Sequence, residues 1–349
     1  IGRGKSAFVK TYLWRLSVFG RRAWIVDPKG EYGELARAWG VEPLALRPGG
    51  TLRLNPLDPG LGADDREEAT RRQGELLASL AGATMDRALQ PAERTALELA
   101  VDDVGRRVAV PTLPAVVDAL LQPGADAARA VRTDPVTLAA DGRAVALELR
   151  RLVSGDLRGM FDGPTTPGVD VRGHAVVLDL SALYHSPALG VLMTCAAAWL
   201  QASLAGGDGN VVLVVDEAWA ILRNLSVARW LQGSWKLARS RGVAHVAVLH
   251  RASDLTAAGA AGSEQVALAQ GLLADSETRV VYGQAPGEAA ATARLLGLSD
   301  TEEQIVTRLG RAVALWKVGD RSFLVQHVLS PLEHELVDTD ARMRPGDAA

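Results

Sequence analysis

Gly4, Lys5 and Ser6 form a tripeptide that stands directly before a stretch with helical character, residues 7–19. The order Gly-Lys-Ser is the end of the phosphate-binding pattern G-x-x-x-x-G-K-[ST], in which glycines let backbone N–H groups point at an oxyanion. The dipole of the following helix favours the same anion. In this pattern the lysine reaches the β- and γ-phosphates and the hydroxyl binds Mg²⁺. We therefore predict that the nucleotide is bound by Gly2, Arg3, Gly4, Lys5, Ser6 and Ala7, with Lys5 also catalytic and Ser6 a metal ligand.

The first glycine of this pattern would stand two residues before Ile1, and the strand that precedes such a loop would also lie outside the chain. Because the chain begins with Ile1 rather than methionine, we expect it to be a piece of a longer protein, cut just upstream. The alternative interpretation is a chance Gly-Lys-Ser at the start of the chain. A second group of residues suited to the same chemistry favours the phosphate loop.

Asp216 and Glu217 follow an uninterrupted apolar run, VVLVV, at residues 211–215. Such a run is typical of a parallel strand that is buried on both faces, and ligands of open α/β sheets bind at the carboxyl ends of such strands. Asp216 would hold Mg²⁺, and Glu217 would polarise the attacking water as the general base. The alternative is an ordinary exposed strand end. Together with the phosphate-loop signature, the pair predicts Mg²⁺-dependent ATP hydrolysis.

Two further pairs of charged residues are candidates for the same site. Lys29 and Glu31 come just after a predicted strand, on the edge where a nucleotide would bind, and we expect one of them to face it; the alternative is a polar turn. Arg239 and Arg241 lie on a predicted helix. An arginine supplied in trans can stabilise charge on a transferred phosphoryl group, and we predict this role for one of the two. The alternative is a solvated arginine on a surface helix.

The segments around these residues alternate between short apolar strands and helices, which predicts an α/β fold with a mostly parallel sheet. The predicted strands span residues 22–27, 175–180, 211–216, 244–250 and 278–282, and the helices between them span 186–204, 227–241, 264–275 and 288–296.

Two regions depart from this alternation. Residues 64–122 lack strand signals and predict an all-α insertion, and Gly319-Asp320 between two apolar segments predicts a C-terminal β-hairpin. The helices of the insertion are expected at 65–80, 91–107 and 113–121. The expected domains are an ATPase core at 1–63 and 123–335, the insertion at 64–122 and a polar tail at 336–349.

The composition excludes several other kinds of site. Cys195 is the only cysteine, which excludes a disulfide within the chain and a cysteine zinc site, and its apolar surroundings predict a core residue. The formal net charge of −3 gives no overall basic footprint for nucleic acid. No apolar stretch reaches the roughly 18 residues of a membrane span. We expect packing roles for Trp219 and Trp230 and structural roles for the scattered histidines His174, His185, His245, His327 and His334, and no stable cofactor beyond ATP and Mg²⁺.

Five segments together resemble a known family. They are DPKGEY at 27–32, LNPL at 54–57, MFDGPT at 160–165, DEAW at 216–219 and KLARSRG at 236–242. The chain is similar, from Gly4 to about Leu329, to the large traffic ATPase of type IV secretion and conjugative transfer systems, of the TraC kind, in the HerA/FtsK branch of RecA-like hexameric motors. The first and fourth segments are the most specific.

The resemblance implies a RecA-like P-loop NTPase core that carries an all-α subdomain. It also implies a hexamer of copies of this chain, with components of the secretion apparatus as partners, on the cytoplasmic side of the inner membrane. The family's docking domain would precede Ile1. ATP hydrolysis would power pilus biogenesis or substrate transfer. The alternatives are a DNA-translocating coupling protein or HerA/FtsK-like pump, with DNA as a partner, and a nucleotide-gated structural ring subunit without significant turnover.

One residue departs from the family's pattern. Members often carry glutamine at the end of the strand that follows Asp-Glu, where it senses the γ-phosphate, whereas this chain has His250-Arg251. Because histidine can also donate a hydrogen bond, we predict that His250 keeps a catalytic sensor role.

Overall fold

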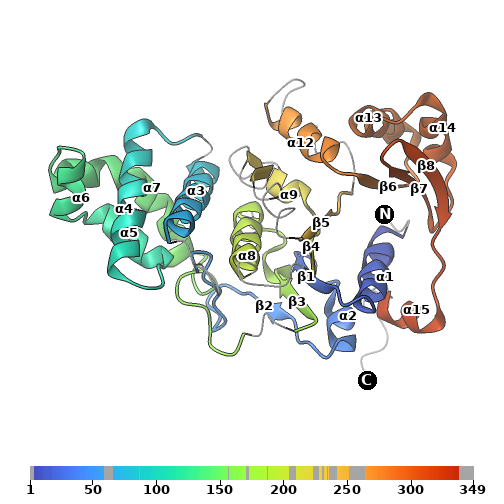
Figure 1. Cartoon of the computed structure of the whole chain (residues 1–349), viewed down its shortest axis with the longest axis horizontal. Helices are drawn as coiled ribbons and strands as arrows, with labels where there is room; N and C mark the ends of the chain where they lie inside the picture. The colour runs from blue at the N-terminus through green and yellow to red at the C-terminus, as the bar shows by residue number, and fades with distance from the viewer. Residues whose placement is uncertain are drawn as a thin grey trace.

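The computed structural model has a parallel β-sheet at its centre, which has five strands within the described residues (Figure 1). The strand order is β2-β3-β1-β4-β5, and every neighbouring pair is parallel, which confirms the predicted α/β class. The strands are β1 (Arg22–Asp27), β2 (Leu44–Ala45), β3 (Ala175–Asp179), β4 (Val211–Val215) and β5 (Ala244–Ala247). The structure describes residues 4–58, 66–85, 87–155, 157–169, 173–186, 188–203, 210–222, 228–229, 232–233, 235, 242–250 and 264–337.

Helices cover both faces of this sheet. Successive side chains of a strand point to opposite faces, so Ile25 of β1 packs in one core with Leu13 of α1, and Trp24 packs in another with Trp199 of α8. Burial on both faces explains why the central strands are continuous apolar runs in the sequence. The first face is covered by α1 (Lys5–Ser17) and α2 (Gly33–Ala38), and the second by α8 (Leu189–Ser203).

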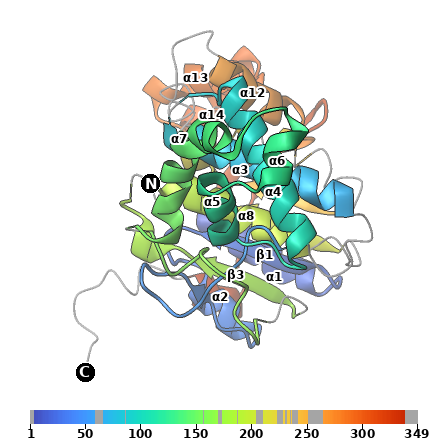
Figure 2. The ribbon, with the colours of Figure 1, turned by 90° about the vertical axis from the view of Figure 1, so that its left-hand side faces the viewer.

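Helices α3 to α7 form an all-α region at one end of the molecule (Figures 1 and 2). Helix α5 packs against α4 and α7, and their apolar side chains join the core on the α8 face of the sheet. Two further helices follow residue 122, and Val145 and Leu149 of α7 are buried in the same core as Val116 of α5. The bounds are α3 (Arg66–Met85), α4 (Pro91–Arg107), α5 (Leu113–Leu121), α6 (Ala125–Ala130) and α7 (Pro135–Val153).

A second, antiparallel sheet follows in the last part of the chain. Strands β7 (Val313–Val318) and β8 (Arg321–Gln326) form the predicted hairpin around Gly319, which is confirmed. The prediction that residues 278–282 continue the parallel sheet is wrong: β6 (Thr278–Tyr282) pairs antiparallel with β7. An apolar run predicts a strand but does not specify its partner. The other elements here are η1 (Ser181–Leu183), α9 (Trp219–Leu222), α12 (Glu264–Ala274), α13 (Pro286–Leu296), α14 (Asp300–Arg308) and α15 (Pro331–Val337).

The C-terminal segment returns to α1, the helix that begins at the Gly-Lys-Ser signature. Helix α15 lies beside α1 in Figure 1, and Arg15 Nε donates a 2.6 Å hydrogen bond to Glu333 Oε1. Thr11 Oγ1 lies 2.6 Å from His327 Nε2. The ring of Phe8 packs at 5.4 Å from that of Trp316 in β7. Helix α1 is therefore held between the parallel sheet on one side and the C-terminal elements on the other.

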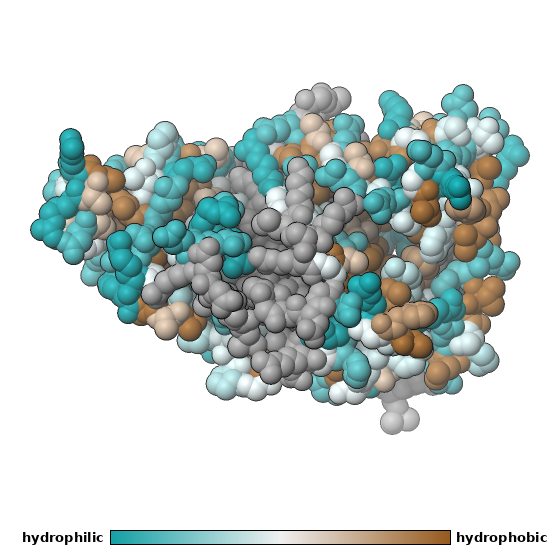
Figure 3. All heavy atoms as spheres, viewed as in Figure 1, coloured by the Kyte–Doolittle hydropathy of each residue, from teal (hydrophilic) through white to brown (hydrophobic). Residues whose placement is uncertain are grey.

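The surface seen from the side of Figure 1 mixes hydrophilic and hydrophobic side chains (Figure 3). Over the C-terminal elements, the exposed large hydrophobic side chains include those of Phe323, Leu324, Val328 and Leu332. Among the described residues, no helix is both long enough and apolar enough to cross a bilayer.

Candidate active site

The carboxyl ends of three neighbouring parallel strands each carry an aspartate. Asp27 ends β1 opposite Asp179 of β3, and Asp216 follows β4 and donates its backbone N–H to the Val26 carbonyl over 3.2 Å. Burial raises the pKa of Asp27 to about 7, against hydrogen bonds from the backbone of Tyr32 and Glu31, and the charges of Asp216 and Asp179 raise it further. This edge of the sheet is therefore rich in negative charge and suited to a cation.

Asp27 shapes the loop that follows β1. Its Oδ1 accepts the backbone N–H of Lys29 at 3.2 Å, and its Oδ2 accepts that of Tyr32 at 2.9 Å. Gly30 between them has φ +69°, in the left-handed region that favours glycine. The loop thereby brings Lys29 and Glu31 to the sheet edge. The sequence-based list of site residues lacked Asp27 and Tyr32, although both belong to the DPKGEY segment.

Asp216 is almost completely buried, with 3% of its surface exposed. Its Oδ1 accepts the backbone N–H of Glu217 at 2.8 Å, and its Oδ2 accepts the hydroxyl of Tyr32 at 3.1 Å. Burial raises the pKa of Asp216, and so do the charges of Glu217 and Glu31, whereas the hydrogen bonds lower it. A buried carboxylate whose geometry is fixed by two donors is a suitable ligand for a hard divalent cation.

Glu217 lies beside Asp216 and is the centre of a network of donors. Its Oε1 forms ion pairs with Lys29 Nζ and, at 2.6 Å, with His250 Nε2. Its Oε2 accepts a hydrogen bond from the indole N–H of Trp219. Burial acts to raise the pKa of Glu217, but the hydrogen bonds from His250, Lys29 and Trp219 outweigh it and lower the pKa to about 2. The carboxylate is therefore ionised and firmly held.

His250 joins the phosphate-loop signature to this network. Its backbone carbonyl accepts a 2.9 Å hydrogen bond from Lys5 Nζ, while its ring contacts Glu217 Oε1. The two halves of the sequence signature, 211 residues apart in the chain, thus meet around one residue that follows β5. The structure brings together six of the predicted site residues at this edge of the sheet, namely Lys5, Lys29, Glu31, Asp216, Glu217 and His250.

The remaining predicted residues surround the start of α1. Gly4 has φ +107°, and a Cβ there would lie 3.5 Å from both Ala312 Cα and the Tyr282 ring, so the chain turns sharply at a close approach. Ser6 and Ala7 lie in the first turn of α1 and are half-buried. The predicted residues Gly2, Arg3, Arg239 and Arg241 lie outside the described part of the chain.

The donor chemistry fits a magnesium nucleotide. The Ser6 hydroxyl and the Asp216 carboxylate are hard oxygen donors, which Mg²⁺ prefers, and the Lys5 ammonium suits a phosphate oxygen. Ligand atoms of Asp216, Glu217 and His250 lie within 4.8 Å of one another, so this cluster can also hold a divalent ion. The arrangement can bind an anion at Lys5, hold a cation at Asp216 and orient a water molecule at Glu217.

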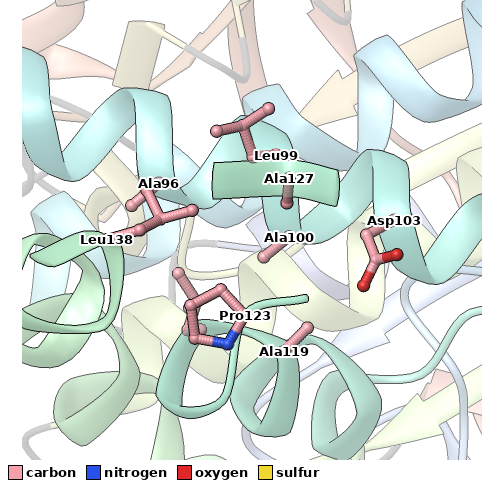
Figure 4. Close-up of a pocket in the computed structure, with 9 residues that line it drawn as sticks. Ala96, Leu99, Ala100, Asp103, Ala119, Pro123, Ala127 and Leu138 are labelled. Atoms are coloured by element: carbon pink, nitrogen blue, oxygen red, sulfur yellow. The ribbon is translucent and has the colours of Figure 1, made fainter. Parts of the chain in front are cut away.

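A small pocket lies far from this edge, in the helical region (Figure 4). It is lined mainly by alanine and leucine side chains, and Asp103 is the one charged residue among its lining residues. A pocket of this composition has few polar groups to orient a ligand. The carboxyl edge of the parallel sheet is therefore the stronger candidate for chemistry.

Comparison with known proteins identifies this fold in solved structures. A scan against models of known protein families finds no match, and a search of curated proteins finds none. The structure of VirB4 of Thermoanaerobacter pseudethanolicus matches with a TM-score of 0.73 at 21% identity, over 96% of this chain and 88% of that chain. The plasmid coupling protein TrwB in complex with ADP and Mg²⁺ matches with a TM-score of 0.63 at 17% identity, over 95% of this chain and 84% of that chain. The chain therefore has the fold of VirB4 and TrwB over nearly its whole length.

Proposed function

We propose that this chain is the ATP-hydrolysing motor of a conjugative or type IV secretion system, in which hydrolysis powers pilus biogenesis or substrate transfer. The observation that carries the proposal is the convergence of Lys5, His250 and Glu217, because it joins an anion-binding lysine to a buried carboxylate that can act on water. The fold shared with VirB4 supports the choice of system, and the TrwB complex with ADP and Mg²⁺ supports binding of a magnesium nucleotide.

In this proposal the start of α1 holds the triphosphate. Backbone N–H groups of the first turn point toward the phosphate oxygens, and the Lys5 ammonium leaves the His250 carbonyl to neutralise them. Ser6 and Asp216 would hold the magnesium ion, and Tyr32 keeps the Asp216 carboxylate in position. Bound Mg²⁺ supplies charge neutralisation at the phosphates. Gly2, Arg3, Gly4 and Ala7 complete the loop.

Glu217 acts on water in this mechanism. Its carboxylate accepts a hydrogen bond from the attacking water and takes up the proton as the water oxygen bonds to phosphorus. His250 orients the carboxylate and senses the γ-phosphate in the place that glutamine has in the family. Arg239 or Arg241 from a neighbouring copy neutralises charge on the transferred phosphoryl group, which requires a ring of copies, and we propose a hexamer on the cytoplasmic side of the inner membrane.

Replacing Glu217 by glutamine tests the proposal. Glu217→Gln should bind ATP like the unchanged chain, because shape and burial are kept, and should lose at least about 100-fold in turnover, since the amide cannot accept a proton. Glu302→Gln is the matched control, because Glu302 is also a poorly exposed carboxylate paired with a lysine, Lys317, in the C-terminal region. Full ATPase activity in Glu217→Gln would refute the role.

A second candidate function is a DNA-translocating coupling protein, and the likeness to TrwB favours it. The nucleotide site would be the same, and the difference would be a DNA substrate. Duplex DNA should then stimulate ATP hydrolysis, and the stimulation should fall steeply with salt, because phosphate contacts release counterions. Hydrolysis that is indifferent to DNA favours the secretion motor. Nucleotide-dependent ring assembly without any turnover would instead indicate a structural ring subunit.

A further inference from the structure

The carboxylate of Glu217 is surrounded by donors. Lys29 Nζ and His250 Nε2 both contact Oε1, and the Trp219 indole N–H is directed at Oε2. The side chain has only 1% of its surface exposed. Two basic groups therefore lie against Oε1. Because both groups contact this buried oxygen, a water molecule can reach Oε1 only after one of them moves away.

The backbone of Glu217 is held in place, so the carboxylate cannot move away from its partners by a backbone shift. Its φ is +52°, in the left-handed region that non-glycine residues rarely adopt, and its N–H is bonded to Asp216 Oδ1 at 2.8 Å. Strain of this kind persists only where the surrounding structure holds the residue in place. The position of the carboxylate is therefore set by the strand end, and access to it depends on its side-chain partners.

Lys29 is the partner that is best able to leave. The imidazole of His250 is a short, rigid ring held near the end of β5, whereas the Lys29 ammonium is carried on a flexible four-carbon stem. The side chains of Lys29 and His250 are 25% and 29% exposed, so both have a route into solvent and only the flexible stem distinguishes Lys29. Its backbone stays in place meanwhile, because Asp27 holds the loop. The movement that uncovers Glu217 is then confined to one side chain.

Lys29 also contacts two side chains besides Glu217. Its Nζ lies 3.0 Å from His250 Nε2 and 5.6 Å from the centre of the Tyr184 ring. The ring already offers the ammonium a cation–π contact while it lies on Glu217, and this contact can persist when the ammonium leaves the carboxylate. The Lys29 ammonium therefore pairs with Glu217 and lies near an aromatic ring that can stabilise it after it leaves the carboxylate.

We propose that Lys29 is a positioning residue that masks Oε1 of Glu217, so that this oxygen acts on water only when the Lys29 ammonium withdraws from it. This inference rests on the proposed function, and it assigns Lys29 a different task from the nucleotide contact that the sequence suggests. Withdrawal of the ammonium limits turnover, and the masked position protects against hydrolysis by an incorrectly assembled site.

Lys29→Ala tests the mask with two measurements on the full chain. The first is the rate at which a water-soluble carbodiimide and an amine label Glu217 without nucleotide, followed by peptide mass spectrometry. The second is ATP turnover, separated into kcat and KM. We expect labelling to rise at least threefold and kcat to rise severalfold, with KM changed less than twofold. Lys317→Ala, which breaks the separate Lys317–Glu302 pair, should change neither measurement.

Other outcomes overturn the mask. Unchanged labelling of Glu217 shows that Lys29 does not cover it, and a fall in kcat with a rise in KM shows that Lys29 binds phosphate instead. Lys29→Gln, with a thermal melt of each variant, replaces Lys29→Ala if the latter does not fold. The labelling measurement separates this proposal from the proposed function, because it needs no ATP. If the chain binds no ATP, the proposed function fails, but Lys29→Ala can still increase the labelling of Glu217.

Discussion

The hydroxyl of Tyr32 donates a hydrogen bond to Asp216 Oδ2 over 3.1 Å, although 184 residues separate the two in the chain. Tyr32 is fully buried, and its own backbone N–H is bonded to Asp27. One side chain thus connects the ends of two adjacent parallel strands, β1 and β4. The contact leaves part of the Asp216 carboxylate available to a cation and fixes its direction.

Tyr32→Phe should weaken magnesium binding, because the Asp216 carboxylate loses a donor that fixes its orientation. A hydrogen bond to a charged group contributes roughly 1.5–3 kcal/mol, so we expect the Mg²⁺ concentration for half-maximal turnover to rise about tenfold or more. The measurement is an ATPase assay over a range of Mg²⁺ concentrations. Tyr12→Phe, on the exposed side of α1, is the control. An unchanged Mg²⁺ dependence would contradict a role for Tyr32 at the metal ligand.

Lys5→Met should weaken nucleotide binding, because it removes the ammonium that would contact the phosphates. Charge-assisted hydrogen bonds are about twice as strong as neutral ones, and we expect the Kd for ATP to rise about tenfold or more. Titration with a fluorescent nucleotide measures this directly. Lys317→Met is the control, since Lys317 lies in β7 and pairs with Glu302. If the two variants bind ATP with equal affinity, Lys5 does not contact the phosphates.

The contact between α1 and α15 should make the fold sensitive to acid. The hydrogen bonds from Arg15, together with those of Ser330, lower the pKa of Glu333 to about 2 against the opposing effect of burial. A lowered pKa means that the stabilisation is complete above the ordinary glutamate pKa, near 4.5, and is lost as the pH falls toward 2. Glu333→Gln should therefore lower the thermal midpoint at pH 7 by about 2–4 °C.

The pH series is the sharper part of this test. The difference in thermal midpoint between the unchanged chain and Glu333→Gln should be constant from pH 7 to 5 and should shrink as the pH falls below about 4.5. Differential scanning fluorimetry across this range measures it. A difference that grows on acidification would mean that the Arg15–Glu333 contact does not stabilise the fold.

Gly142 of α7 should not tolerate a larger residue, because the helices of the all-α region pack closely there. A Cβ at Gly142 would lie 2.9 Å from Leu120 Cδ2 and 3.3 Å from Ala96 Cβ. Overpacking costs about 1–3 kcal/mol, so Gly142→Val should lower the thermal midpoint by about 2–8 °C without changing ATP affinity. Gly74→Val is the control, since a Cβ at Gly74 meets nothing within 4 Å. Equal midpoints for the two variants would show that α5 and α7 do not pack as described.

Local signals account for most of the elements that were predicted correctly. The helix expected at residues 91–107 matches α4, which begins at Pro91, a residue suited to the first helical turn. Helix α7 escaped prediction although a comparable signal precedes it: Asp134 accepts the backbone N–H groups of Val136 and Thr137, and Pro135 follows it. The sequence-based helix predictions for the insertion therefore stopped at residue 121, and the domain boundary at residue 122 stays a prediction.

The pairing of distant strands was harder to predict from the sequence than the strands themselves. The TRVVY run was correctly predicted as a strand, and the error concerned its partner, β7, whose register sets Thr278 opposite Val318. An apolar pattern reports that a segment is extended and partly buried, which both kinds of sheet require. Its direction relative to a neighbour depends on the path of the chain between them.

The sequence by itself determined which chemical groups are available. The glycine, lysine and serine of one motif and the two acidic residues of the other carry their hydrogen-bond donors and acceptors in any fold. It also determined the sheet-forming runs, through their apolar character. Only the tertiary structure decided that Lys29 lies on Glu217, that Tyr32 holds Asp216 and that the His250 carbonyl receives Lys5. These contacts join residues 184 to 245 positions apart, and they exist because the strand order β3-β1-β4-β5 brings separate strand ends to one edge.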